Sequence, residues 1–335
     1  MTDQPFVSII VPCYNEQSTI QKLLGALHSQ TYPLDKMEVV IADGRSTDNT
    51  RQVIDAFSRE HTALTVRVIE NPARNIPSGV NHAIRESRGE IIVRLDAHSM
   101  PIPEYVERCV EAHRTGKGDN VGGVWDIQAG ADTWIAESIS HAAAHPLGVG
   151  DAMYRLNAKP GVVDTVPFGS FHRSLIERLG AFDETLLSNE DYEFNTRLRE
   201  AGGVVWLDPS IRSVYFSRPT LPSLASQYWR YGFWKLKMLK RYPHTLRWRQ
   251  ALPPIFVFAL ASMVVLSLWF GFARLFLSVQ LTAYFAILAL AGIQLAFRKR
   301  KGYLVWGLPL SIATMHICWG AGFLWSGFVS LLKNG

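Results

Sequence analysis

The first 100 residues switch between two periods of apolar and polar positions. Short apolar runs rich in β-branched residues, such as "FVSIIVPCYNE" and "MEVVIADGRSTDNT", each predict a buried strand that ends in polar residues. Between the runs, "STIQKLLGALHSQ" and "TRQVIDAFSRE" place apolar residues at helical spacing. Strands that alternate with helices through short links predict right-handed crossovers. We therefore expect an α/β domain with a mostly parallel sheet that is covered on both faces.

The pattern is weaker from residue 121 to 165, where "SISHAAAHPLGVGDAMYR" indicates a helix followed by a glycine-rich loop. The following residues, 164–202, predict a strand, a helix, a turn at Gly180 and a second helix that opens near Asn189. The stretch "VVWLDPSIRSVYF" then predicts two short strands.

Charge almost disappears from the chain after residue 251. Three apolar runs, at about 252–272, 275–297 and 303–332, each exceed the roughly 18 to 20 residues that a membrane-spanning helix needs. The preceding stretch, "LPSLASQYWRYGFWKLKMLKRYP", is amphipathic and rich in aromatic and basic residues, which is typical of helices that lie on a membrane surface. The predicted organisation is an α/β domain over 1–222, an interface segment over 223–250 and a transmembrane region over 251–335.

The basic residues show which partners to expect. The chain carries 34 lysines and arginines against 29 acidic residues, a net charge of +5. The surplus gathers in "WKLKMLKRYPHTLRWRQ" and in 298–301, both beside apolar runs, which favours anionic lipid over nucleic acid. With three spans and a cytoplasmic α/β domain, residues 298–301 fall on the cytoplasmic side, as the positive-inside rule requires.

Two further features agree with a cytoplasmic α/β domain. Cys13, Cys109 and Cys318 lie far apart and show neither zinc-ligand nor disulfide-framework spacing, which fits a reducing compartment. The first 16 residues lack a basic segment and have too short an apolar run for a signal peptide.

Polar clusters follow several of the predicted strands, where ligands of parallel sheets usually bind. In "RLDAH", Asp96 and His98 lie on the same side of an extended segment, so a divalent cation between them would hold a diphosphate. An imidazole beside a carboxylate favours Mn²⁺, whereas oxygen ligands alone would suit Mg²⁺ as well. The alternative is a simple turn in which Asp96 caps the next segment and His98 faces water.

A second acidic cluster lies where the later helix opens. In "SNEDYEF", Asn189, Glu190 and Asp191 either cap that helix and complement its dipole or carry chemistry. As chemistry, one carboxylate would remove a proton from an attacking hydroxyl while its neighbour orients the base or the acceptor.

Other candidates have equally plain structural alternatives. Tyr14, Glu16 and Asp43 would bind a nucleotide by ring stacking and carboxylate contacts, or they simply follow two strand ends. Gly79 and Asn81 open a helix near the phosphates or form part of a turn. In the amphipathic stretch, three residues would face a phosphate and line a sugar or lipid path, or only rest on the membrane: Gln227, Trp229 and Arg230.

Taken in order, these stretches resemble the inverting family 2 glycosyltransferases with a GT-A fold. "VSIIVPCYNE" resembles their first strand, "ADGRSTDNT" their second-strand aspartate motif and "RLDAH" their Asp-x-Asp. "NED" is similar to their acidic acceptor-side motif and "QYWRY" to Gln-x-x-Arg-Trp, so the resemblance covers about residues 6–235. The Asp-Ala-His form, "GVGDAMYR", "DTVPFGSFHR" and the membrane tail are most similar to succinoglycan-type glucosyltransferases of bacterial exopolysaccharide assembly.

The resemblance implies roles for individual residues. Asp191 would be the general base with Glu190 beside it, and Asp96 would contact the diphosphate and the metal. The nucleotide would be held by Pro12, Tyr14, Glu16 and Asp43. The candidates argued from the residues themselves complete the expected site: Arg45, Gly79, Asn81 and Asp96 at the nucleotide, and Asn189, Gln227, Trp229 and Arg230 at the acceptor or diphosphate. The chain departs from the family pattern in having Arg45 after Gly44, His98 for the final aspartate and Tyr231 for tryptophan.

The resemblance also implies the reaction and the setting. We expect transfer of a hexose, with glucose from UDP-glucose as the donor, to a polyprenyl-diphosphate-linked oligosaccharide at the bacterial inner membrane. Mn²⁺ or Mg²⁺ would be the cofactor. Two alternatives remain open at this point: a processive polysaccharide synthase and a non-catalytic, membrane-bound scaffold that binds sugar nucleotides.

Overall fold

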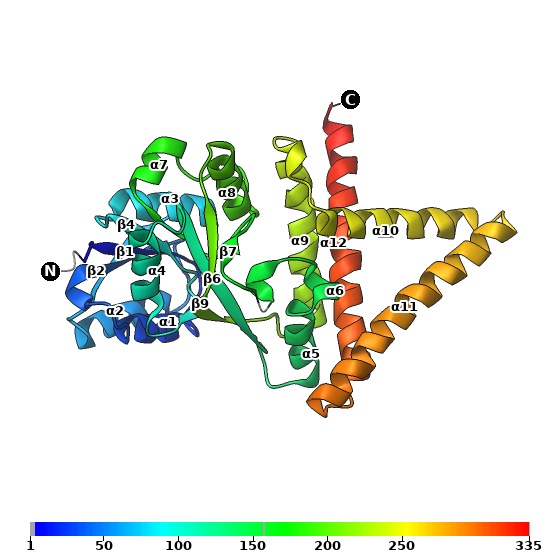
Figure 1. Cartoon of the computed structure of the whole chain (residues 1–335), viewed down its shortest axis with the longest axis horizontal. Helices are drawn as coiled ribbons and strands as arrows, with labels where there is room; N and C mark the ends of the chain where they lie inside the picture. The colour runs from blue at the N-terminus through cyan, green and yellow to red at the C-terminus, as the bar shows by residue number, and fades with distance from the viewer. Residues whose placement is uncertain (1–3, 157, 335) are drawn as a thin grey trace. The chain divides into compact units, whose positions relative to one another are not determined.

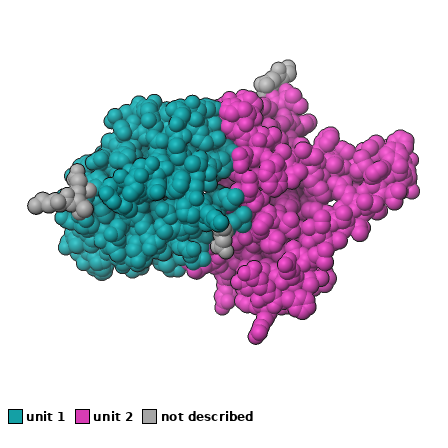
Figure 2. All heavy atoms as spheres, in the orientation of Figure 1, with its two compact units in different colours: residues 1–126, 153–215 teal, residues 127–152, 216–335 magenta. Residues whose placement is uncertain are grey.

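The computed structural model describes residues 4–156 and 158–334, which fall into two compact units (Figures 1 and 2). Unit 1 contains residues 1–126 and 153–215, and unit 2 contains residues 127–152 and 216–335. This division differs from the predicted boundaries at 222 and 250. Residues 127–152 come from the middle of the predicted α/β domain and yet pack with the C-terminal helices.

The first half of unit 1 is a parallel α/β sheet. Its strands lie in the order β3-β2-β1-β4, and each neighbouring pair is parallel, as predicted. The elements are β1 (Val7–Cys13), α1 (Ile20–His28), a 3₁₀ turn η1 (Leu34–Lys36), β2 (Met37–Asp43), α2 (Thr50–Glu60), β3 (Thr65–Glu70), α3 (Ile76–Glu86) and β4 (Ile91–Arg94).

The second half of unit 1 makes the sheet mixed. β4 continues into β8, β6, β9 and β5, with antiparallel pairing of β8 to β4 and β6 and of β5 and β7 to β9. β9 is one strand of 12 residues, not the two short strands predicted. The elements are β5 (Met100–Pro101), α4 (Tyr105–Arg114), β6 (Asn120–Gln128), the 3₁₀ turn η2 (Met153–Arg155), β7 (Gly161–Val162), β8 (Ser170–His172), α7 (Ser174–Leu179), α8 (Glu190–Glu200) and β9 (Val205–Phe216).

Alternation along the strands divides the core of unit 1 into two layers. In β1, Val7, Ile9 and Val11 belong to one buried cluster with residues of α1, α2 and α4, whereas Ile10 faces the opposite cluster with residues of α3 and α8. Side chains of a strand point alternately to its two faces, so a sheet covered on both sides gives this arrangement. The predicted α/β fold with a mixed sheet is confirmed, and the parallel pairs are those of the half from β3 to β4.

One buried histidine makes the stability of unit 1 depend on pH. His113 of α4 is 9% exposed, and its Nε2 lies 3.0 Å from the carbonyl oxygen of Ser170. Burial, together with the neighbouring His172, lowers the pKa of His113 from 6.5 to about 4. The unfolded chain therefore binds this proton more readily than the folded one, and stability is lost as pH falls through this window.

We expect unfolding of unit 1 to become easier by about 2–3 kcal/mol between pH 7 and pH 4 through His113 alone. The melting temperature of the full chain can be followed by tryptophan fluorescence. Between pH 7 and pH 4 it should fall less in His113→Gln than in the wild type. His82→Gln on α3 is the control variant and should keep the wild-type slope. Identical slopes in all three proteins would contradict the prediction.

Unit 2 is built from long apolar helices. Three of them, α10 (Trp248–Leu266), α11 (Gly271–Lys299) and α12 (Leu304–Asn334), are long and apolar enough to cross a membrane. Large apolar side chains on them face outward, with Phe297 82% and Trp306 76% exposed. In water such surfaces would be unfavourable, so the predicted membrane region agrees with the structure. The remaining elements of unit 2 are α5 (Trp134–Ala143), α6 (Pro146–Val149), α9 (Leu221–Leu239) and a 3₁₀ turn η3 (Pro243–Thr245).

The amphipathic stretch forms α9, and its apolar face packs on another helix. α9 runs alongside α12 (Figure 1), and Leu224 and Tyr228 belong to one buried cluster with Ile312. The backbones approach so closely that a Cβ on Gly232 would overlap the carbonyl oxygen of Trp319. Small residues at helix contacts permit such packing, which in a membrane replaces the hydrophobic effect.

Ion pairs hold residues 127–152 within unit 2. Glu137 of α5 accepts hydrogen bonds from Lys301 and from the hydroxyl of Tyr303, and Asp151 pairs with Arg247 and Arg249. Lys301, the last residue of the basic cluster predicted to be cytoplasmic, thus has a partner from the middle of the chain.

Candidate active site

The order of the strands in unit 1 brings three predicted clusters to one edge of the sheet. β1 lies between β2 and β4, with Cys13 opposite Asp43 and Ile10 opposite Arg94. Tyr14 directly follows β1, Asp43 is the last residue of β2, and Asp96 lies in the loop after β4. Because the carboxyl ends of parallel strands share one edge, this is where a ligand of such a sheet is expected.

Hydrogen bonds join the loops that follow β1 and β2. The backbone N–H of Asn15 donates to the hydroxyl of Ser46 at 2.9 Å, and the backbone N–H of Thr47 donates to Oδ1 of Asn15 at 2.8 Å. The ring of Tyr14 lies beside Gly44, where a Cβ would be 3.2 Å from Cδ2 of the ring. Tyr14 is 46% exposed, so its ring is accessible to stack on a base.

Asp43 lies beneath these loops with its carboxylate already engaged. Its oxygens accept from the backbone N–H of Ser46 at 3.2 Å, from the Ser46 hydroxyl at 2.5 Å and from Nε of Arg51 at 2.5 Å. The carboxylate is fully buried, so it contacts a nucleotide only if one of these partners gives way. Arg45 is turned outward, and its guanidinium lies 3.5 Å from Glu70.

The Asp96–His98 turn contains the predicted metal ligands. Nδ1 of His98 lies 3.1 Å from Oε1 of Glu16, so the structure places Glu16 as the partner of this imidazole. A carboxylate on one ring nitrogen fixes the imidazole for binding a metal through the other. Oδ1 of Asp96 is buried without a hydrogen-bond partner, an orphaned acceptor of the kind that a cation satisfies. This donor set fits a divalent cation.

The guanidinium of Arg94, at the end of β4, binds the acidic cluster at the start of α8. Arg94 donates from Nη2 to Oε1 of Glu190 at 3.0 Å and from Nη1 to Oδ1 of Asp191. The same Nη2 lies 3.5 Å from Oδ1 of Asp96. The predicted donor side and the predicted base are therefore neighbours across a buried guanidinium, although about 95 residues separate them in sequence.

Several predicted residues have other roles in this structure. Asn81 is buried and bonds to the backbone of Phe182 in both directions, at 2.9 Å each, and to Glu184. Gly79 permits close packing, since a Cβ there would lie 3.2 Å from Cβ of the buried Pro12. These contacts hold α3 to β1 and to the loop before α8, and they use both amide hydrogens of Asn81.

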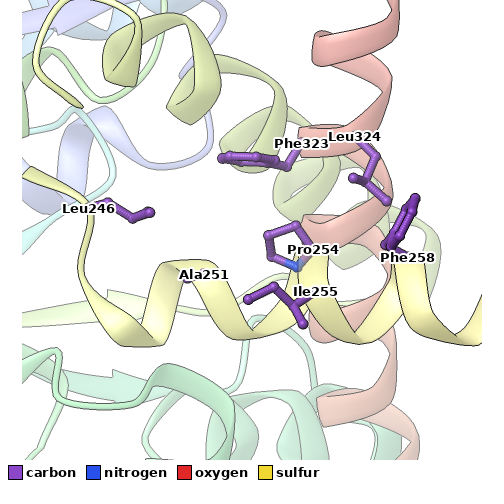
Figure 3. A pocket seen from close by; sticks show the side chains of 7 residues that line it. All are labelled: Leu246, Ala251, Pro254, Ile255, Phe258, Phe323 and Leu324. Atoms are coloured by element: carbon purple, nitrogen blue, oxygen red, sulfur yellow. The ribbon is translucent and has the colours of Figure 1, made fainter.

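The motif in α9 belongs to unit 2. Gln227 is buried and donates to the hydroxyl of Tyr231 at 3.0 Å, whereas Trp229 is 39% exposed and Arg230 is exposed. Unit 2 also contains an apolar pocket of about 310 Å³ between α10 and α12 (Figure 3). Its lining suits hydrocarbon and offers no charged group to a nucleotide: Leu246, Ala251, Pro254, Ile255, Phe258, Phe323 and Leu324.

The cysteine closest to the site is not a nucleophile. Cys13 is buried at the end of β1, and burial, reinforced by Glu16 and Asp43, raises the pKa of its thiol. A thiol that stays protonated at neutral pH does not attack a sugar, so chemistry at this edge falls to the carboxylates.

Two side chains that pair with the predicted carboxylates escaped the sequence analysis, namely Arg94 and Arg51. Each pairs with a predicted carboxylate. Arg94 did leave a signal, because a lone basic residue inside the apolar run "EIIVRLDAH" has to be paired when the strand is buried.

In unit 1 a parallel, nucleotide-binding half of the sheet continues into an antiparallel half, and acidic residues from both halves meet at one edge. This arrangement defines a glycosyltransferase with a GT-A fold. The chain belongs to glycosyl transferase family 2, whose model matches residues 8–180.

Comparisons along the full chain agree with this membership. The chain is 29% identical over 320 residues to the succinoglycan biosynthesis protein ExoA of Rhizobium meliloti, covering 94% of this chain and 93% of that protein. It is 26% identical over 336 residues, 98% of each chain, to a dolichyl N-acetyl-alpha-D-glucosaminyl phosphate 3-beta-D-2,3-diacetamido-2,3-dideoxy-beta-D-glucuronosyltransferase of Methanococcus voltae.

A solved structure shares the fold over almost the whole chain. The mannosyltransferase PcManGT from Pyrobaculum calidifontis, solved with GDP-Man and Mn²⁺, matches with a TM-score of 0.67 at 21% identity. The match covers 97% of this chain and 88% of that one. The predicted family and fold are thus confirmed, and the protein is a membrane-associated glycosyltransferase that uses a nucleotide sugar.

Proposed function

We propose that the protein is an inverting hexosyltransferase of exopolysaccharide assembly, with UDP-glucose as donor and a polyprenyl-diphosphate-linked saccharide as acceptor. The observation that carries the proposal is the convergence of Asp96, Glu190 and Asp191 on Arg94. It puts a carboxylate suited to the donor's diphosphate next to one suited to activating the acceptor.

The donor would be held at the edge formed by the β1, β2 and β4 loops. The exposed ring of Tyr14 would stack on the base, and Asp43 would contact the base or the ribose after exchanging a partner. Asp96 and His98 would hold Mn²⁺ or Mg²⁺. Among the described residues, no three metal-ligating side chains form a group, so the donor's diphosphate and water would complete the coordination. The bound cation would offset negative charge on the leaving group.

The reaction would be a single displacement. Asp191 takes the proton of the acceptor hydroxyl while that oxygen forms a bond to the anomeric carbon of the donor sugar. The bond from the anomeric carbon to the diphosphate oxygen breaks, and the nucleoside diphosphate leaves with the electron pair. Attack from the face opposite the leaving group inverts the configuration.

The acceptor and location follow from the relatives and from unit 2. One relative is a succinoglycan biosynthesis protein and another acts on a dolichyl-linked sugar phosphate, which supports a lipid-linked acceptor. The three apolar helices would make the protein multi-pass in the bacterial inner membrane. Unit 1 would then face the cytoplasm, where nucleotide sugars occur, on the side of the basic residues 298–301.

The test uses the full chain in proteoliposomes with Mn²⁺, radiolabelled UDP-glucose and other nucleotide sugars, and polyprenyl-diphosphate-linked glycans. We expect one sugar to be added per acceptor from UDP-glucose, with the β-anomeric product that inversion of an α-linked donor requires. Long products would instead support a processive synthase. Nucleotide binding without transfer from any donor would overturn the proposal in favour of a scaffold.

A further inference from the structure

Arg94 is the point at which the two halves of the candidate active site are joined. It is the last residue of β4 and is 3% exposed. Its guanidinium makes ion pairs with Glu190 and Asp191 of α8 and lies 3.5 Å from Asp96. A buried arginine requires partners, and removing its partners or the arginine itself leaves uncompensated buried charge.

The two pairs with α8 are hydrogen-bonded, whereas the contact with Asp96 is not. Oδ1 of Asp96 remains without a hydrogen-bond partner although Arg94 is close. The guanidinium therefore donates to the two carboxylates of α8, while Oδ1 of Asp96, at 3.5 Å, makes only an ion pair with it and accepts no hydrogen bond. A planar fork that donates to two carboxylates at once fixes their orientation in a way that a lysine ammonium does not.

The start of α8 has no cap of its own to hold it. The N-cap residue Asn189 has a left-handed backbone, with φ of 69°, and its side chain makes no capping hydrogen bond. Polar side chains at this position usually fix the first turn of a helix. In this chain the first turn is held by Arg94, which reaches it from the neighbouring end of β4.

We propose that Arg94 is a positioning residue that acts through Asp191, holding the base at the distance from the Asp96 turn that the transfer requires. The inference rests on the proposed function, because it takes Asp191 as the base. It adds that the position of the Asp191 carboxylate is fixed by a residue of β4 and not by residues of α8. β4 is also the strand that leads to the Asp96–His98 turn.

A double-mutant cycle on kcat tests this role. The variants are Arg94→Met, Asp191→Asn and the two together, in the full chain reconstituted with Mn²⁺, donor and lipid-linked acceptor. We expect each single change to lower kcat by about 10²-fold or more, and Arg94→Met to cost less than about threefold in the Asp191→Asn background. The Kd of UDP, measured by calorimetry, should change little in Arg94→Met.

Chemical rescue provides a second readout that a purely structural role would not give. Millimolar guanidinium should restore kcat about five- to tenfold in Arg94→Ala, whereas urea, a neutral molecule of similar shape, should not. Arg94→Lys keeps the charge but loses the fork, so it should fold and still show the loss in kcat. Arg173→Met is the matched control, because Arg173 is an arginine bonded to backbone oxygens of Ser87 and Gly89. It should lower the melting temperature and show no rescue of kcat.

The outcomes separate the two proposals. If the wild type transfers no sugar, the proposed function fails. If the wild type transfers sugar and Asp191→Asn does so at the same rate, Asp191 is not the base and the role of Arg94 fails with it, while the transferase function stands. If Asp191→Asn is impaired but the losses of the two single variants multiply in the double variant, Arg94 does not act through Asp191. Full activity of Arg94→Lys, or equal rescue by urea and guanidinium, would also overturn the role of Arg94.

Discussion

Asp191→Asn is expected to lower the rate of sugar transfer by about 10³-fold, because an amide does not accept the proton of the acceptor hydroxyl. Its shape is retained, and Arg94 can still donate to the amide oxygen. The loss should therefore appear in kcat, with the Kd of UDP within about threefold of the wild-type value. Initial rates in proteoliposomes and calorimetry with UDP give the two quantities.

Asp208→Asn is the control for this variant. Asp208 lies on β9 of the same unit and accepts from the backbone N–H of Ser210 at 2.8 Å, away from the acidic cluster. It should transfer sugar at the wild-type rate. An Asp191→Asn protein that keeps wild-type kcat would remove Asp191 as the base and leave Glu190 as the carboxylate to test.

Asp96→Asn is expected to reduce the rate of sugar transfer by about 10²-fold. The neutral amide would bind the divalent cation more weakly than the carboxylate does, and this cation would offset the negative charge of the leaving nucleoside diphosphate. Chelation of the wild-type protein should remove activity to a similar extent, and Mn²⁺ should restore it. Because Glu16 orients the imidazole of His98, Glu16→Gln should weaken apparent Mn²⁺ affinity by about 10- to 100-fold with a smaller effect at saturating metal.

A titration of transfer activity against Mn²⁺ checks these expectations in the wild type, Asp96→Asn and Glu16→Gln. Gln17→Ala, one residue beyond Glu16, is the neighbouring control and should match the wild type. Activity that survives chelation, combined with normal rates in Asp96→Asn and His98→Ala, would show that the turn binds no catalytic metal.

The sequence was sufficient to predict much of unit 1 because the relevant information is local. β1 and β2 are short β-branched runs, α2 begins and ends where its apolar spacing does, and strand–helix alternation dictates parallel order. Parallel order then brings Tyr14, Asp43 and Asp96 to one edge without any knowledge of distances. The long apolar runs predict α10, α11 and α12 for a similar reason, since length and composition alone decide them.

Contacts between distant segments could not be predicted in this way. The sequence indicated Asn81 near the start of a helix, but it did not reveal the hydrogen bonds of Asn81 to the backbone of Phe182, about 100 residues later. Glu16 was predicted at the nucleotide, and nothing in the sequence revealed that its Oε1 lies 3.1 Å from Nδ1 of His98, 82 residues later. Residues 127–152 belong to unit 2 because α5 packs with α9 and α12, and Glu137 pairs with Lys301, contacts that no periodicity reveals. Each case requires knowledge of which elements pack together.

The close approach of α9 and α12 bears on how the protein is made. α9 leaves the ribosome first, and both α10 and α11 must be synthesised and inserted before the helix that covers Gly232 exists. During that interval the face of α9 that packs on α12 lacks this neighbour, although α5 already exists. Insertion machinery or a chaperone would have to shield it, and a nascent chain stalled between α11 and α12 would be a natural substrate for quality-control proteases.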